Sequence, residues 1–238
     1  MGLLGVVGRN PVRVRVGPAN GSGWGCVVQD DARTWTLSAH RNGGGSVAVY
    51  RSPPGEWTSF SSERPMVPRE RRLEGGVVVG AVTGPGAKPC GMEGSPWAFV
   101  YEGTIADADA LRAALDPSWV VYGALETPGD FVFVHLLKYL AQVGPFVSTD
   151  LAMVRATCGL WRARALGALA FVCSDGRSLY AYALGRSLAL AHLRGAVVVG
   201  SPEMLPEVVT TETIVSGELV SLWREPLRRW SVLVTPDQ

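Results

Sequence analysis

Residue types that often carry enzyme chemistry are sparse in this chain, and their spacing forms no common catalytic motif. The three histidines are His40, His135 and His192, and the four cysteines are Cys26, Cys90, Cys158 and Cys173. The cysteines show neither CxxC spacing nor the Cys/His pattern of a metal site, and no GxSxG elbow, P-loop or HExxH helix is present. The sequence therefore predicts no metal site, no cofactor and no internal catalytic motif.

These residues have structural explanations instead. His135 lies in an apolar helical run and is expected to pack in the core, whereas the other two histidines follow strands and have no acidic partner at motif spacing. Cys26 and Cys173 lie in apolar, strand-like runs, where buried free thiols are common. Cys90 and Cys26 are the candidates for a nucleophilic thiol. No basic neighbour at motif spacing would lower the pKa of Cys90.

Composition limits the class of protein. The chain has 238 residues, of which 47% are hydrophobic and 18% charged, and its formal net charge is +1. This length and apolar content suffice for a substantial core. The balanced charge predicts binding to neither nucleic acid nor an anionic membrane. Because no signal peptide or membrane-spanning run is visible, we expect a cytoplasmic protein.

The elements that would position a site are strands, then helices, then strands again. Strands are expected at 3–7, 25–29, 35–39, 46–50, 76–83 and 97–101, with an exposed loop over 51–75 and an irregular segment over 84–96. Helices are expected at 107–115, 130–143 and 149–162, with Asp130 as the N-cap of the second. Further strands are expected at 169–173, 179–183, 188–192, 196–200, 219–223 and 231–234. This order predicts a single α+β domain over 1–238, with two stacked sheets covered by helices.

Several segments match one family in order and spacing. They are the opening GLLGVVG, NGSGWG at 20–25, FVYEGTI at 99–105 with its following helix, TPGD at 127–130, the Ser-Asp-Gly hairpin over 171–182, and the closing segment 214–222. Together they resemble the class II glutamine amidotransferases, which are N-terminal-nucleophile hydrolases. Within that family the chain is most similar to small stand-alone members related to the ergothioneine-pathway γ-glutamyl amidase. The resemblance covers nearly the whole chain and implies a four-layer α-β-β-α sandwich.

The resemblance also implies a mechanism and the positions that would carry it. In that family an N-terminal Cys attacks the glutamine amide with its own α-amine as base, and an Asn side chain and a Gly N–H stabilise the oxyanion. An Arg binds the substrate carboxylate, and an Asp pairs with the substrate amine. Here Met1 or Gly2 falls at the nucleophile position, depending on the alignment, and neither supplies a thiol or hydroxyl.

The other positions differ too. Glu102 replaces the oxyanion Asn, while Gly103 is kept. The Arg position falls at Val82 and the substrate-amine Asp position at Pro128. A carboxylate would repel a developing oxyanion, and loss of one oxyanion donor alone costs on the order of 3 kcal/mol. The sequence therefore predicts a vestigial pocket with no catalytic residue, formed by Met1, Gly2, Trp24, Val82, Tyr101, Glu102, Gly103 and Pro128.

Three functional hypotheses follow. The first is a catalytically inactive amidotransferase-like protein that acts by binding a protein partner or a small amino-acid-like or amine ligand, as a subunit, scaffold or sensor. The second is an active glutamine amidotransferase or γ-glutamyl amide hydrolase that uses rearranged residues. The third is a structural interaction subunit, which leaves homo-oligomerisation open. Its candidate interface residues are Trp57, Trp161, Trp223 and Trp230.

Overall fold

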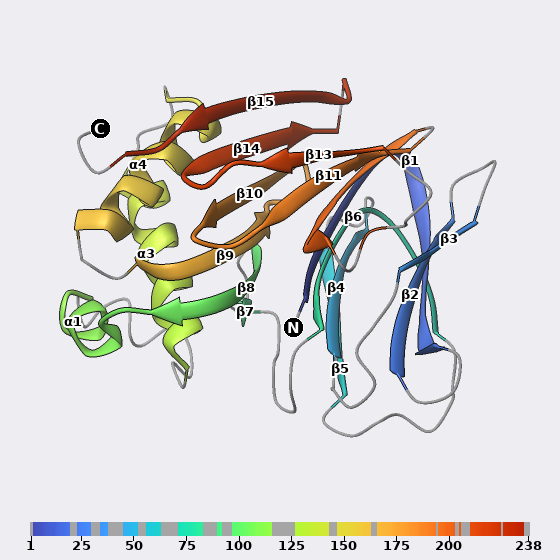
Figure 1. Cartoon of the computed structure of the whole chain (residues 1–238), viewed down its shortest axis with the longest axis horizontal. Helices are drawn as coiled ribbons and strands as arrows, with labels where there is room; N and C mark the ends of the chain where they lie inside the picture. Colours follow the sequence, from blue (N-terminus) through green and yellow to red (C-terminus); the bar gives the residue numbers. More distant parts are fainter. Residues whose placement is uncertain are drawn as a thin grey trace.

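The fold consists of two antiparallel sheets with helices against one of them (Figure 1). A computed structural model describes residues 2–19, 23–29, 34–37, 45–51, 56–62, 71–82, 90–91, 97–115, 127–142, 147–162, 166–193, 195–202, 205, 210–224 and 226–235. All structural statements below concern these residues. The α+β class predicted from the order of elements is confirmed.

Sheet A contains the beginning of the chain. Its strands are β1 (Gly2–Ala19), β2 (Gly23–Gln29), β3 (Thr34–Leu37), β4 (Gly45–Arg51), β5 (Glu56–Ser62), β6 (Arg71–Val82), β11 (Leu188–His192), β12 (Ala196–Gly200) and β13 (Thr211–Ile214). The order is β13-β11-β12-β1-β6-β4-β5, and β2 pairs with β1 and β3. The first half of β1 pairs with both β12 and β6, which places the opening apolar run in the middle of the sheet.

Sheet B contains the hairpin that the sequence predicts most clearly. Its strands are β7 (Cys90–Gly91), β8 (Ala98–Ile105), β9 (Leu166–Ser174), β10 (Ser178–Leu184), β14 (Glu218–Trp223) and β15 (Arg228–Leu233), in the order β15-β14-β10-β9-β8-β7. The Asp175 carboxylate accepts the backbone N–H groups of Arg177 and Ser178 at 2.9 and 2.8 Å. Gly176 supplies the positive φ of 85° that this turn requires.

Three helices pack on the outer face of sheet B: α1 (Ala108–Ala113), α3 (Pro128–Gln142) and α4 (Thr149–Arg162). Asp107 caps α1, and its carboxylate accepts the Ala110 N–H at 2.7 Å. The N-cap predicted for α3 is wrong by three residues. Thr127 is the cap, because its carbonyl accepts the Phe131 N–H and its own N–H donates to the Asp130 carboxylate at 2.8 Å. Asp130 is therefore the reciprocal partner of a capping box.

The described residues form two separate cores. Between the sheets the buried side chains are aliphatic, for example Leu3 with Val172 and Leu190. Between sheet B and the helices aromatic rings pack among the aliphatic side chains, for example Phe99 stacked on Phe133 with centroids 5.5 Å apart. These cores define three layers of the expected sandwich, namely helices, sheet B and sheet A. Within the described residues no helix covers the outer face of sheet A.

One prediction from composition is wrong, and one long strand segment was not identified. The segment over 51–75 is not all loop, because β5 pairs along β4 and β6 begins at Arg71. The second half of β1 was missed, although Val12, Val14 and Val16 alternate with arginine in the way expected of a strand. This half pairs with both β2 and β6. No helix among the described residues has the length and apolar character needed to cross a bilayer.

Candidate functional site

The start of β1, the end of β12 and the end of β8 meet through one buried serine. Ser201, which directly follows β12, is 4% exposed. Its Oγ accepts the Leu3 N–H at 2.9 Å, and its own N–H donates to the Leu3 carbonyl at 3.1 Å. The Ser201 hydroxyl then donates to Oε2 of Glu102 at 3.2 Å. A hydrogen-bonded chain therefore links the first strand of sheet A to β8 of sheet B.

Glu102 has a second partner on the other side of its carboxylate. Nη1 of Arg186, in the turn between β10 and β11, lies 3.6 Å from Oε1 of Glu102. The Glu102 side chain is 11% exposed, whereas that of Arg186 is 42% exposed. A carboxylate this buried requires hydrogen bonds or a counter-charge, and here it has both. We call Leu3, Ser201, Glu102 and Arg186 the Glu102 connection.

Gly103 fixes the backbone beside this carboxylate. Its φ is +120°, a conformation that residues with a side chain rarely adopt, and an added Cβ would overlap the carbonyl oxygen of Ala168. The register between β8 and β9 shifts just after this residue, between Gly103 and Ile105. Only glycine fits a position that is both bulged and this close to a neighbouring strand. The retention of Gly103 in the sequence therefore has a local structural reason.

Tyr101 and the start of α3 also lie against each other. An added Cβ at Gly129 would overlap the Tyr101 ring, so the ring rests directly on the helix backbone. On its own strand Tyr101 stacks with Phe99, with ring centroids 6.0 Å apart. Pro128 is the first residue of α3 and precedes this contact by one position. Tyr101 and Pro128 thus lie on the helix side of β8, whereas the next side chain, that of Glu102, points to the other face of the sheet, towards Ser201.

The remaining predicted pocket residues divide into two groups. Val82 is the last residue of β6 and pairs directly with Gly2, so their backbones lie together at the start of β1. Trp24 is not brought to this place, because β2 pairs it with Pro18 at the opposite end of β1. Met1 lies outside the described residues.

Two described cysteines and one histidine are buried in ways that suit them poorly to catalysis. Burial raises the pKa of Cys173 well above its ordinary value, and burial also raises the pKa of Cys158. Burial lowers the pKa of His135, which is 3% exposed and whose Nε2 lies 3.2 Å from the Leu111 carbonyl. The prediction that His135 is a packed core residue is confirmed. In the part of the chain that the structure describes, no group of His, Cys, Asp and Glu side chains could hold a metal ion.

Comparisons with known proteins agree with the geometry at the level of the fold. No protein-family model matches the sequence, and no curated protein matches it. Solved structures do match. A glutamine aminotransferase class-II domain protein from Silicibacter pomeroyi has a TM-score of 0.65 and 16% identity, over 99% of each chain. The chain has the fold of a class II glutamine amidotransferase domain.

Other amidotransferases match over similar lengths. A predicted glutamine amidotransferase from Pseudomonas aeruginosa has a TM-score of 0.58 and 17% identity, over 94% of this chain and 98% of that one. Glutamine phosphoribosylpyrophosphate amidotransferase from B. subtilis has a TM-score of 0.60 and 12% identity, over 99% of this chain but only 49% of its own length. The amidotransferase resemblance is thus confirmed for the fold, and the ergothioneine-like branch stays a prediction.

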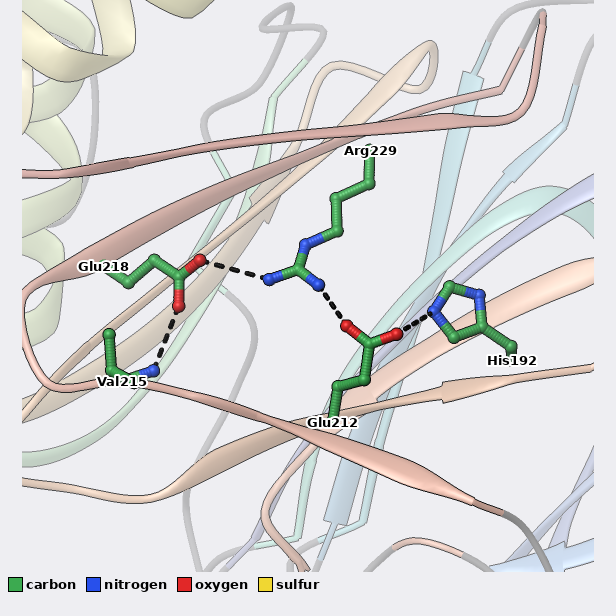
Figure 2. A network of polar contacts seen from close by, with 5 residues as sticks. All are labelled: His192, Glu212, Val215, Glu218 and Arg229. Carbon is green, nitrogen blue, oxygen red and sulfur yellow. Dashed lines mark hydrogen bonds and ion pairs between the residues drawn. The ribbon is translucent and has the colours of Figure 1, made fainter.

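A second polar group joins the two sheets of this amidotransferase fold at a different edge (Figure 2). Arg229 on β15 of sheet B bonds Glu212 on β13 of sheet A, and its Nη2 lies 3.1 Å from Oε1 of Glu218. Glu212 also lies 3.1 Å from Nε2 of His192, a partner that sequence spacing did not indicate. Oε2 of Glu218 accepts the Val215 N–H at 3.0 Å. We call these residues the Arg229 connection.

Proposed function

We propose that the chain is a non-catalytic member of the amidotransferase fold that binds an amine-bearing small molecule at Glu102. The observation that carries this proposal is the buried carboxylate of Glu102, held by the Ser201 hydroxyl at 3.2 Å. An ionised carboxylate accepts hydrogen bonds and donates none. It cannot stabilise a developing oxyanion by donation, and its charge would oppose one.

The partners of Glu102 support binding of a cation. Arg186 already places a positive charge 3.6 Å from Oε1, so the position accommodates a cationic group. Arg186 is 42% exposed and its contact is longer than a close ion pair, so a ligand ammonium could replace it at modest cost.

The positions that the resemblance assigns to glutamine recognition support the loss of hydrolysis. Val82 lies where the carboxylate-binding Arg is expected, and a valine cannot make the bidentate contact. Pro128 lies where the substrate-amine Asp is expected, and proline carries no charge. Since recognition and oxyanion stabilisation are both affected, a single compensating residue would not restore the family reaction.

A ligand screen with a matched control tests the proposal. Amines and amino acids are titrated calorimetrically into the wild-type protein, Glu102→Gln and Glu212→Gln. We expect a ligand whose affinity falls at least about tenfold in Glu102→Gln, which corresponds to 1.4 kcal/mol. Glu212→Gln also removes one carboxylate charge from an arginine contact, but at the other edge, and should bind as the wild type does. If no amine binds, or if both variants bind equally well, the ligand proposal fails.

A separate assay tests the absence of catalysis. The protein is incubated with glutamine and with an electrophilic glutamine analogue, and ammonia and intact mass are measured. We expect no ammonia above the buffer control and no adduct. A stoichiometric adduct mapped to one residue, with ammonia release abolished by substitution of that residue, would instead establish the active-enzyme hypothesis.

A further inference from the structure

The exposed large hydrophobic side chains of the described residues gather around one strand. They are Leu151, Val215, Trp230 and Leu233, with exposed fractions of 44%, 51%, 39% and 54%. Trp230 and Leu233 belong to β15. Val215 is next to it, because its N–H bonds Glu218, the cross-strand partner of Leu233. Trp230 and Leu233 are three positions apart in the strand, so their side chains point to opposite faces of sheet B.

Trp230 points to the face of sheet B on which α4 begins. Trp230 is the cross-strand partner of Ser221, and the Ser221 hydroxyl donates to the Asp150 carboxylate at 2.8 Å. Asp150 immediately precedes Leu151 in α4. Trp230 therefore lies on the face of sheet B that carries α4, whereas Leu233 lies on the face towards sheet A, so β15 exposes an apolar side chain on each face.

β15 is also the last described strand of sheet B (Figure 1). Two hydrogen bonds show which backbone groups of β15 face away from β14. The Arg224 N–H donates to the Arg177 carbonyl, on the β10 side of β14. The Val234 N–H donates to the Gly217 carbonyl, on the β15 side. Because strand residues alternate in direction, Trp230 and Val232 bond β14. The N–H and C=O groups of Arg229, Ser231 and Leu233 face away from it.

The usual protections of an edge strand are weak here. β15 contains no proline or lysine, and its register with β14 runs through six consecutive pairs without a bulge. Its two arginines are held to their own chain. The Arg228 guanidinium lies 4.3 Å from the Trp223 ring centroid, and Arg229 bonds Glu212 and Glu218. Neither positive charge is therefore available to prevent strand pairing at this edge.

We propose that β15 pairs with β15 of a second copy, antiparallel, around a two-fold axis at Ser231. This register places Ser231 opposite its own copy and Arg229 opposite Leu233 of the second copy. All three outward-facing residues then form hydrogen-bonded pairs on both chains.

Side chains fit this register as well. Trp230 lies opposite Val232 of the second copy in a non-hydrogen-bonded pair, which is a favourable aromatic and β-branched combination. No arginine faces an arginine, and the aliphatic part of Arg229 covers the exposed Leu233. With a net charge of +1 for each chain, two copies repel each other only weakly. The result is an isologous dimer with sheet B continuous across both copies.

Ser231→Pro is the sharpest test because the Ser231 N–H faces away from β14. Proline is tolerated on an edge strand when its missing N–H faces outward, so the monomer should keep its fold while the central pair of the dimer is lost. Ser231→Ala keeps the N–H and is the matched control. Sedimentation equilibrium across a wide concentration range should show dimers for the wild-type protein and Ser231→Ala, and monomers for Ser231→Pro.

Two further measurements decide the remaining outcomes. If Ser231→Pro does not fold, as judged by circular dichroism, Leu233→Lys replaces it, since that side chain is exposed and should also yield monomers. Hydrogen exchange of the wild-type protein should slow at the amides of Arg229, Ser231 and Leu233 as concentration rises. A wild-type protein that is monomeric throughout, or a dimer that the folded variants leave unchanged, overturns the proposal. None of these variants touches Glu102, so the ligand screen is independent.

Discussion

The two polar connections between the sheets use similar chemistry in different surroundings. In the Glu102 connection the central serine is 4% exposed and the Glu102 side chain 11% exposed. In the Arg229 connection the Glu218 side chain is equally buried, at 11% exposed, but that of Arg229 is 28% exposed and those of Glu212 and His192 are each 50% exposed. The first also involves the backbone of β1 and a glycine at φ +120°, whereas the second depends almost entirely on side chains. Buried charge with a constrained backbone is typical of a site, and an exposed ion pair is typical of replaceable surface structure.

The largest difference is expected at the backbone of the Glu102 connection. Gly103→Ala should lower the free energy of unfolding by about 4 kcal/mol, because it combines a disfavoured φ with steric overlap against Ala168. Gly195→Ala is the matched control. Gly195 also has a positive φ, of 143°, but an added Cβ there meets nothing within 4 Å. Its cost should be about 1 kcal/mol. Equal losses in urea unfolding would show that Gly103 has no steric role.

The next effect concerns the buried serine. Ser201→Ala should cost about 2 kcal/mol, since it leaves the buried Leu3 N–H without its acceptor and removes a donor to Glu102. Ser216→Ala removes a bond of the same type and length, from the Gly185 N–H to Ser216 Oγ at 2.9 Å, but at an exposed position where water can replace it. That control should cost only a few tenths of a kcal/mol. If thermal unfolding shows the two variants to be alike, burial is not what distinguishes the Glu102 connection.

The sequence predicted one member of the Glu102 connection and could not predict the others. Glu102 and its neighbour Gly103 are found because they lie in a segment that resembles the family. Ser201 and Arg186 lie far from Glu102 in the chain and are brought to it only by the pairing of β12 with β1 and the turn after β10. Such partners depend on the packing of the sheets, which no local pattern encodes.

The fold was predictable where the pattern is local. The β9–β10 hairpin and α4 are marked by a Ser-Asp-Gly turn and by helical periodicity, and both lie where the sequence placed them. β5 was missed because its Ser-rich sequence lacks a clear strand pattern, and its pairing with β4 is visible only in the fold. The proline-rich and charged surroundings made the whole segment resemble a loop. By contrast, the alternation of valine in the second half of β1 was a usable signal.

Within the Arg229 connection the arginine should matter most. Arg229→Ala removes the counter-charge of Glu218, which is 8% exposed, and leaves this carboxylate with the hydrogen bond from the Val215 N–H. We expect a loss of about 1.5 kcal/mol in the free energy of unfolding. Arg229→Lys should recover only part of this loss, because a lysine keeps the positive charge but cannot bridge two carboxylates with a planar fork. No difference between alanine and lysine in urea unfolding would mean that the bridging geometry contributes nothing.

The smallest effect is expected for Glu212→Ala. This variant tests the contrast between the two connections most directly. Glu212 bonds both Arg229 and His192, yet its side chain is 50% exposed, so water screens both contacts. Its loss should cost about 0.5 kcal/mol at low ionic strength. Because exposed ion pairs are screened by salt, this cost should shrink towards zero at about 1 M salt, where the Debye length is about 3 Å. The cost of Ser201→Ala should persist under the same conditions, since it reflects a buried hydrogen bond. If salt leaves the cost of Glu212→Ala unchanged, the Glu212 carboxylate is structurally required in the same way as Ser201. The two connections would then differ only in the backbone constraint at Gly103.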